Sequence, residues 1–221
     1  MYVPAHFALS DTQIIELLTS MGTGELVTLG PDGLVATRVP MLFDPTVGEH
    51  GALLCHLQRN NTQWQHTATE ALVIIDGPQH YVSPTWYPDG QAGTVPTWDY
   101  VTVHVYGDLI AHDDLAWTGQ VVRRLTDHHE GRSGSGRPEW SVDEAAPGYV
   151  DAMLRAVVGL ELQITRIEAK AKMAQNKAPA DVVALAELLA AEGDAEGERW
   201  LRDVSLPAAQ ARADTLAALR R

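Results

Sequence analysis

The alternation of apolar and polar positions divides the chain into strands and helices in an order typical of an antiparallel barrel. The apolar or alternating runs expected of strands lie at 24–30, 34–44, 52–57, 71–76, 98–112 and 159–168. Pro31-Asp32-Gly33 predicts a hairpin turn between the first two, and Pro40 indicates an edge or a bulge in the second. Too few strand–helix–strand units are present for a doubly wound parallel sheet. We therefore predict an α+β, mainly β, protein built on a closed or nearly closed barrel.

Helical periodicity marks segments between and after these strands. The expected helices lie at about 10–21, 58–69, 113–129, 147–157, 181–192 and 207–221. Asp113 or Asp114 is the expected N-cap of the third, and Gly193 the expected stop of the fifth. We predict a barrel domain over 1–176 and a helical C-terminal extension over 177–221, packed on the barrel or on a dimer.

Residues 81–100 (YVSPTWYPDGQAGTVPTWDY) concentrate prolines and aromatic side chains between two expected strands. Each proline fixes its own φ and biases the preceding residue toward extended geometry, and Asp89-Gly90 predicts a turn. The segment therefore predicts a shaped loop with flat aromatic faces. Two interpretations stay open: the aromatics plug one end of a barrel, or they form the wall of a site for a planar ligand.

Composition and charge restrict the class of protein. The formal net charge of −13 argues against direct DNA binding, because DNA binders neutralise phosphates with basic side chains. No apolar run reaches the roughly 20 residues that span a bilayer, and the N-terminus lacks a signal-peptide pattern, so we expect a soluble cytoplasmic protein without a membrane partner. The single Cys55 excludes an internal disulfide and a cysteine-rich zinc site. His128, His129 and Glu130 are not expected to hold a metal, because adjacent helical residues point in different directions.

Three groups of polar residues lie where an anion or a polar ring can be held. Arg59 and Asn61 sit between a strand end and a helix start, where backbone N–H groups favour an anion, although an asparagine there also serves as an N-cap. Arg38 is either an anion contact or a solvent-facing strand residue. Lys170 and Lys172 either donate hydrogen bonds to a phosphate or carbonyl-rich ring, or begin a solvated helix.

Four segments together resemble one family. They are MYVPAHF at 1–7, HLQRNNTQW at 56–64, YVSPTWY with VPTWDYVTVHVYG within 81–107, and KAKMAQNKAPAD at 170–181. Over most of its length the chain resembles the PaiB family, the FMN-binding negative transcriptional regulators. The resemblance implies a flavin-type split β-barrel with peripheral helices, FMN as cofactor, and a homodimer with two equivalent flavin sites at its interface.

Matched by position, the resemblance implies flavin contacts from several segments. Arg59 and Asn61 are candidates at the phosphate, and His56 faces the same site. The strand expected to line the flavin contributes Thr37, Arg38 and Pro40. The residues expected to stack on the ring or cover it are Ser83, Trp86, Trp98 and Tyr100. The segment expected to reach the site from the other subunit contributes Lys172, Gln175 and Asn176.

Three functions stay open at this point. The first is a homodimeric FMN-binding split barrel that acts as a regulator or as a flavin-dependent oxidoreductase. The second is a ligand-sensing transcriptional regulator without redox chemistry, acting through a protein partner or DNA. The third is a barrel that binds haem or a deazaflavin, for which His56 and His104 are the haem ligands to test. No nucleophile–base set is evident, so hydrolysis is not expected and no catalytic residue is assigned.

Overall fold

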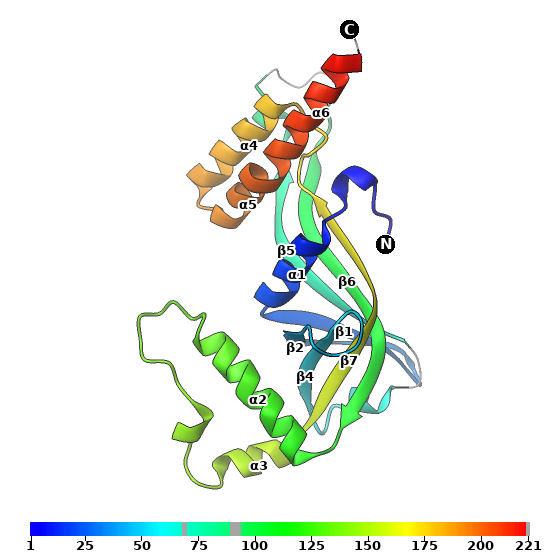
Figure 1. Cartoon of the computed structure of the whole chain (residues 1–221), viewed down its shortest axis with the longest axis vertical. Helices are drawn as coiled ribbons and strands as arrows, with labels where there is room; N and C mark the ends of the chain where they lie inside the picture. The colour runs from blue at the N-terminus through cyan, green and yellow to red at the C-terminus, as the bar shows by residue number, and fades with distance from the viewer. Residues whose placement is uncertain (68–69, 89–93, 220–221) are drawn as a thin grey trace. The chain divides into compact units, whose positions relative to one another are not determined.

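The computed structural model, which describes residues 1–67, 70–88 and 94–219, contains one seven-stranded sheet and several helices (Figure 1). The strands are β1 (Thr23–Gly30), β2 (Gly33–Pro40), β3 (Leu42–Asp44), β4 (Ala52–Gln58), β5 (Ala71–Val82), β6 (Thr97–His112) and β7 (Val157–Lys172). Their order in the sheet is β2-β1-β5-β6-β7-β4-β3. The edge strands β2 and β3 are separated in the chain only by Met41, so the two edges of an open sheet are covalently continuous. The α+β, mainly β, class is confirmed.

The second expected strand is divided where its proline indicated an irregularity. It forms β2 up to Pro40 and resumes as β3 at Leu42. β2 pairs antiparallel with β1, with Gly30 opposite Gly33. Gly33 has φ of +117°, a conformation that favours glycine, which explains why a glycine occupies this position of the tight hairpin.

Two strands extend further than their hydrophobic runs indicated. β5 continues to Val82, and β7 continues to Lys172, so the interpretation of Lys170 and Lys172 as the start of a helix is wrong. Pairing with neighbouring strands holds these polar ends in an extended conformation.

The helix expected over 58–69 is also wrong in extent, because only the 3-10 helix η2 (Thr62–Gln65) forms there. The turn expected at 89–90 lies outside the described residues.

The helices mostly lie where the periodicity placed them. They are α1 (Asp11–Ser20), α2 (Leu115–Glu130), α3 (Tyr149–Arg155), α4 (Pro179–Glu192), α5 (Ala195–Trp200) and α6 (Leu206–Leu219). Four 3-10 helices, η1 (Ala5–Phe7), η2, η3 (Pro84–Trp86) and η4 (Val142–Glu144), and the π-helix η5 (Leu201–Ser205) complete the described elements. Asp114 caps α2 by accepting from the backbone N–H of Ala116, and Gly193, with φ of +83°, ends α4 as expected. Among the described residues, no helix is long and apolar enough to cross a membrane.

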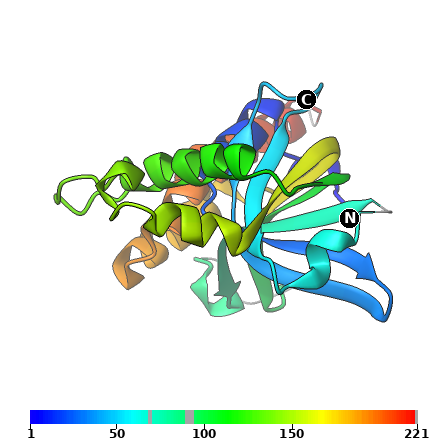
Figure 2. The same cartoon turned by 90° about the horizontal axis from the view of Figure 1, so that it is seen from below.

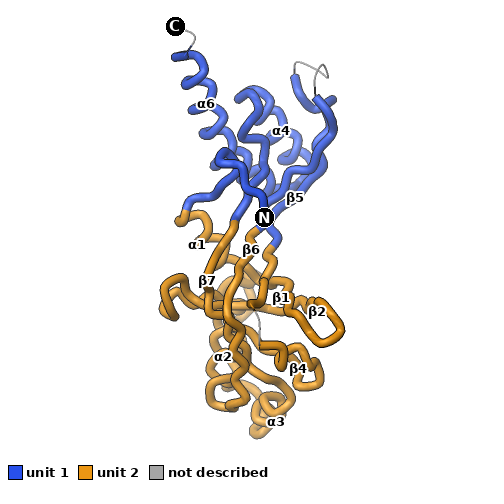
Figure 3. The backbone as a smooth tube through the Cα atoms, turned by 90° about the vertical axis from the view of Figure 1, so that its right-hand side faces the viewer, with its two compact units in different colours: residues 1–10, 76–102, 169–221 blue, residues 11–75, 103–168 orange. Residues whose placement is uncertain are grey.

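The chain divides into two compact units (Figure 3). Unit 1 comprises residues 1–10, 76–102 and 169–221, and unit 2 comprises residues 11–75 and 103–168. The strands β5, β6 and β7 contribute residues to both. The domain boundary expected at 176 stays a prediction.

Each unit has its own buried apolar residues. In unit 2, Leu42 and Leu54 of β3 and β4 pack with Val121 and Leu125 of α2, which lies beside α3 (Figure 2). In unit 1, the buried face of α4 includes Leu185 and Leu189. Burial of these apolar side chains is the main stabilising contribution within each unit.

Candidate functional site

A buried amide, Gln63, connects η2 to the β1–β2 hairpin in unit 2. Only 1% of this residue is exposed. Its Nε2 donates to the carbonyl oxygens of Leu26 and Val35 at 2.9 and 3.2 Å, and its Oε1 accepts from the Thr37 hydroxyl at 2.6 Å. Sequence reasoning did not select Gln63, because no local pattern distinguishes it from an exposed helix residue.

Asn61 belongs to the same polar cluster. Its Oδ1 accepts from the backbone N–H of Gln63 at 3.0 Å, which confirms the interpretation of Asn61 as an N-cap. Its Nδ2 donates to the Thr37 hydroxyl at 3.1 Å. The structure therefore brings Thr37 and Asn61 together, as the expected flavin set requires, but their polar atoms already satisfy one another.

Arg59 is fixed at the end of β4 by contacts from distant parts of the chain. Its Nε donates to the carbonyl oxygen of Arg155 at 3.0 Å, and its Nη2 to that of Val157 at 3.1 Å. Nη2 also pairs with Asp113 at 2.6 Å, and this hydrogen bond lowers the pKa of the Asp113 carboxyl. The guanidinium is thus oriented before any ligand arrives, and a bound anion competes with Asp113 for it.

The other two candidates on β2 face away from this cluster. Arg38 pairs with Glu25 on β1 at 2.6 Å, and 63% of its side chain is exposed. Pro40 is exposed at the end of the strand. These positions agree with the interpretation of Arg38 as a solvent-facing residue.

His56 lies on β4 against a cavity of about 200 Å³ in unit 2. The cavity is mostly apolar, with Val122 of α2 and Met153 of α3 in its lining. Burial lowers the pKa of His56, and its buried Nδ1 has no hydrogen-bond partner within the described residues. The imidazole is therefore neutral at pH 7 and offers one polar atom to an apolar space.

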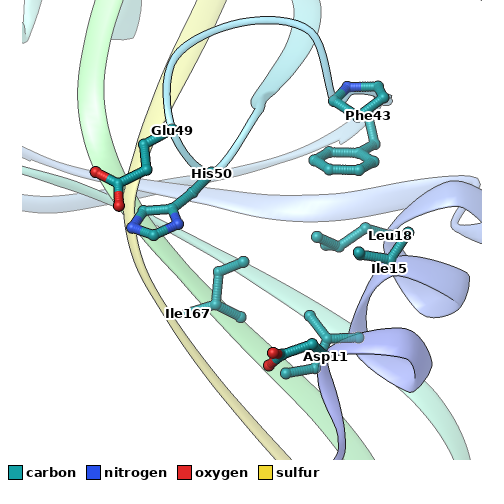
Figure 4. Close-up of a pocket in the computed structure, with 9 residues that line it drawn as sticks. Asp11, Ile15, Leu18, Phe43, Glu49, His50 and Ile167 are labelled. Carbon is teal, nitrogen blue, oxygen red and sulfur yellow. The ribbon is translucent and has the colours of Figure 1, made fainter.

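Figure 4 shows another cavity of unit 2, with a volume of about 430 Å³. Side chains of α1, β3, the loop after β3, and β7 line it; those labelled are Asp11, Ile15, Leu18, Phe43, Glu49, His50 and Ile167. The volume lies in the range of about 300–1,000 Å³ typical of small-molecule sites. Sequence reasoning missed it, because three distant segments form it and none of the expected flavin residues lines it.

In unit 1, Lys172 is the centre of a second polar cluster. Its ammonium group donates to the Thr97 hydroxyl at 2.7 Å and to the Trp98 carbonyl oxygen. It also lies 3.5 Å from Asp99 Oδ1 and 5.9 Å from the centre of the Tyr100 ring. The end of β7 therefore contacts the start of β6, which brings Lys172 to two residues of the expected set, Trp98 and Tyr100.

Asp99 is a buried carboxylate that sequence reasoning did not select. Its side chain is 4% exposed, and burial raises its pKa to about 6 despite the opposing effect of Lys172. His80 Nε2 lies 3.9 Å from Asp99 Oδ2, and His80 Nδ1 lies 3.8 Å from Asp194. The sequence did contain a signal for this buried carboxylate. In the alternating VPTWDY motif, Asp99 lies on the strand face opposite to Trp98 and Tyr100, and an acidic residue on an inward face is unusual.

The aromatic candidates of unit 1 gather around Tyr81. The Trp86 and Trp98 rings meet the Tyr81 ring edge-on, with centroid distances of 5.9 and 6.2 Å. Ser83 caps η3 by accepting from the Thr85 N–H. The tryptophans therefore form a cluster with an edge-to-face geometry that is favourable without any ligand.

The last two candidates follow β7. Gln175 is buried and bonds within its own turn, to the Met173 N–H at 2.8 Å and the Ala171 carbonyl oxygen at 2.7 Å. Asn176 accepts from Arg212 through its backbone oxygen at 2.7 Å and lines a cavity of about 210 Å³ together with Lys172. Gln175 thus shapes the turn, whereas Asn176 borders a cavity.

Comparison with known families identifies the class of protein. A family model described as "Putative FMN-binding domain" matches residues 1–166. The chain belongs to this FMN-binding family. The match confirms the family that the sequence motifs resemble, and it confirms FMN as the expected cofactor.

Individual relatives agree with this assignment. The chain is 27% identical over 194 residues to the protease synthase and sporulation protein PAI 2 of Bacillus subtilis, covering 86% of this chain and 89% of that protein. Among solved structures, the flavocytochrome Anf3 from Azotobacter vinelandii has a TM-score of 0.52 at 10% identity, covering 73% of this chain and 67% of that one. The FAD and heme binding protein from Mycobacterium smegmatis has a TM-score of 0.51 at 17% identity, covering 74% and 71%. These similarities confirm the flavin-type split-barrel fold.

Proposed function

We propose that this chain is a cytoplasmic, homodimeric FMN-dependent redox protein of the PaiB type. The observation that carries the proposal is the position of Arg59 and Asn61 at the end of β4, inside the region that the FMN-binding family model covers. When bound, FMN supplies the electron transfer, and the protein supplies binding and orientation.

The residues around Arg59 fit a phosphate group. Two backbone carbonyls hold the guanidinium, so little side-chain freedom is lost when an anion binds. The pair with Asp113 is exposed enough for solvent and ligand to compete, since 60% of the Asp113 side chain is accessible. Arg59 is therefore the first phosphate candidate, and Lys172 is the second.

Comparing FMN with riboflavin tests both candidates, because the two ligands differ only in the phosphate. Affinities are measured by quenching of flavin fluorescence for wild type, Arg59→Ala and Lys172→Ala. If Arg59 holds the phosphate, Arg59→Ala weakens FMN about tenfold or more and changes riboflavin by less than about twofold. If only Lys172→Ala weakens FMN selectively, Lys172 in unit 1 holds the phosphate instead. If each variant loses the same affinity for FMN as for riboflavin, neither residue holds the phosphate.

Two further variants sharpen the test. Arg123→Ala is a matched control, because Arg123 is also an exposed arginine paired with an aspartate, Asp143, at 2.5 Å. Its affinity for FMN should equal that of wild type. Asp113→Asn removes the competing carboxylate and should tighten FMN but not riboflavin. The absence of FMN binding at millimolar concentration would overturn the redox proposal itself.

A regulatory function is the second candidate. It is favoured by the name of the Bacillus subtilis relative, which associates that protein with protease synthesis and sporulation. The net charge of −13 makes a protein partner a better expectation than DNA. To test this, a complex captured from cell extract is titrated with FMN, and FMN-dependent release of a partner supports regulation. Electron transfer from a reductant to the bound flavin supports the redox function instead.

A further inference from the structure

The cavity of about 210 Å³ in unit 1 combines opposite charges with hydroxyl and amide groups. Asp99 of β6 and Lys172 of β7 lie in its lining. The lining also includes Asn176 and Lys177 in the turn after β7, Tyr87 after η3, and Thr94. The site therefore brings together segments that are distant in the sequence.

Two polar atoms of this cavity are buried without a hydrogen-bond partner among the described residues. They are Oδ2 of Asp99 and the hydroxyl oxygen of Thr94. The Asp99 side chain is 4% exposed, so water compensates it poorly, and its Oδ1 already faces Lys172 at 3.5 Å. His80 Nε2 lies 3.9 Å from Oδ2, beyond hydrogen-bond distance. A buried acceptor that lacks a donor destabilises the folded chain. A ligand with an N–H or O–H group directed at Oδ2 removes this cost.

The charges in the cavity restrict the ligand further. Lys172 and Lys177 both act electrostatically on Asp99, so a cationic ligand meets two ammonium groups. An anionic ligand meets the Asp99 carboxylate itself. A neutral ligand that carries both a donor and acceptors is compatible with all three groups.

Size restricts the ligand to a single ring. A cavity of roughly 150 Å³ holds one benzene ring, so about 210 Å³ holds one six-membered ring with polar substituents. Tyr87 provides an aromatic surface at the cavity, and the Lys177 ammonium lies 4.8 Å from the centre of its ring. A flat ring with polar edges is therefore the best geometric match.

We propose that this cavity binds a neutral pyrimidine-dione ring, in which an N–H group is flanked by carbonyl groups. Asp99 accepts from the ring N–H, and Lys177 and the Asn176 side-chain amide donate to the carbonyl oxygens. The same chemistry is offered by a free pyrimidine-dione and by the terminal ring of a flavin. The second source rests on the proposed FMN function, whereas the first does not.

Calorimetric titration with uracil tests the recognition chemistry. Wild type is expected to bind one uracil per chain, and a uracil methylated at both ring nitrogens is expected to bind at least about tenfold more weakly, because it has no N–H. Asp99→Asn keeps the shape of the side chain but places an amide where the acceptor stood, and it should weaken uracil by a similar factor. Asp76→Asn, in the same unit and outside the cavity lining, is the control. Unchanged circular dichroism and melting temperature show that each variant is folded.

Titration with FMN then distinguishes the two sources. Competition between FMN and uracil, with both weakened by Asp99→Asn, identifies the flavin ring as the occupant. Simultaneous binding of both identifies a separate pyrimidine-dione. Uracil binding without FMN binding supports this inference while the proposed function fails. If uracil does not bind at millimolar concentration and Asp99→Asn leaves FMN affinity unchanged, the inference is overturned while the proposed function stands. Equal binding of uracil by wild type and Asp99→Asn overturns it as well.

Discussion

Asp99 and His80 form an ionisable pair inside unit 1, and opposing effects act on the pKa of each. Burial raises the pKa of Asp99 to about 6, and the nearby ammonium groups of Lys172 and Lys177 oppose that rise. Burial also lowers the pKa of His80, although the carboxylates of Asp194 and Glu192 act in the other direction. At pH 7 an ionised aspartate therefore lies beside a neutral histidine. Neither nitrogen of His80 has a hydrogen-bond partner within the described residues, which leaves this region less stabilised than a paired network.

The titration of Asp99 predicts a pH-dependent stability. In the unfolded chain its carboxyl loses the proton near pH 3.8, whereas the folded chain keeps it until about pH 6. Over this window the folded state binds more protons, so the contribution of Asp99 to the free energy of unfolding falls as pH rises. The difference between the pKa values of Asp99 in the unfolded and folded chain corresponds to roughly 3 kcal/mol. We expect Asp99→Asn to gain about this much relative to wild type between about pH 4 and about pH 7, measured by urea unfolding.

A control on the protein surface separates burial from general charge effects. The Asp143 side chain is 76% exposed, so Asp143→Asn should follow the pH profile of wild type. His80 titrates in every variant, and most of its contribution therefore cancels in the comparison. A constant difference between Asp99→Asn and wild type across this pH range would contradict the burial argument.

At the scale of elements, side-chain hydrogen bonds hold η2 against the β1–β2 hairpin. It is a single turn and has little intrinsic stability. Gln63 compensates by bonding to carbonyl oxygens on both strands, and Asn61 caps the turn. The position of η2 therefore depends on side-chain hydrogen bonds rather than on helix propensity.

Removing the Gln63 side chain should cost substantial stability. Gln63→Ala leaves the carbonyl oxygens of Leu26 and Val35 without this donor and the Thr37 hydroxyl without this acceptor. The expected loss in free energy of unfolding is roughly 2–4 kcal/mol, measured by urea denaturation. Gln65→Ala, on the same turn but exposed, should change stability by less than about 0.5 kcal/mol. Similar losses in both variants would indicate that the turn, rather than the buried amide, carries the effect.

The sequence predicted these elements where the signal was local. Asp114 and Gly193 marked helix ends because capping depends on one side chain or one φ angle. Pro40 marked the break between β2 and β3 for the same reason. The polar end of β7 was missed, because neighbouring strands hold Lys170 and Lys172 in an extended conformation that their own residues do not dictate.

The candidate sites were predictable only in part, because side chains from distant segments build them. The motifs selected Arg59, Asn61 and Lys172, and the structure finds them in polar clusters. No pattern along the chain indicated that Asp113 pairs with Arg59 or that Asp99 faces Lys172. Such pairings depend on which strands become neighbours, and periodicity does not encode that choice.

At the scale of the whole molecule, three strands connect the two compact units. β5, β6 and β7 each begin in one unit and end in the other, so their backbone continues without a linker. Domains joined by flexible linkers often unfold separately. Continuous strands oppose this, because loss of order in one unit removes support from the strand segments of the other. We therefore predict a single cooperative unfolding transition.

Core substitutions in each unit test this cooperativity. Leu189 of α4 lies in unit 1, Leu26 of β1 lies in unit 2, and each is 1% exposed. Replacing either with Ala should lower the free energy of unfolding by roughly 2–5 kcal/mol. In a cooperative chain both variants shift the whole urea transition, so circular dichroism and tryptophan fluorescence still coincide and the slope m is unchanged.

Leu34→Ala, at a residue that is 79% exposed, should leave the midpoint near that of wild type. All samples are compared at one protein concentration, because the proposed dimer would make the midpoint concentration-dependent. A biphasic curve for Leu189→Ala, with an early phase absent from Leu26→Ala, would show that unit 1 unfolds alone despite the shared strands.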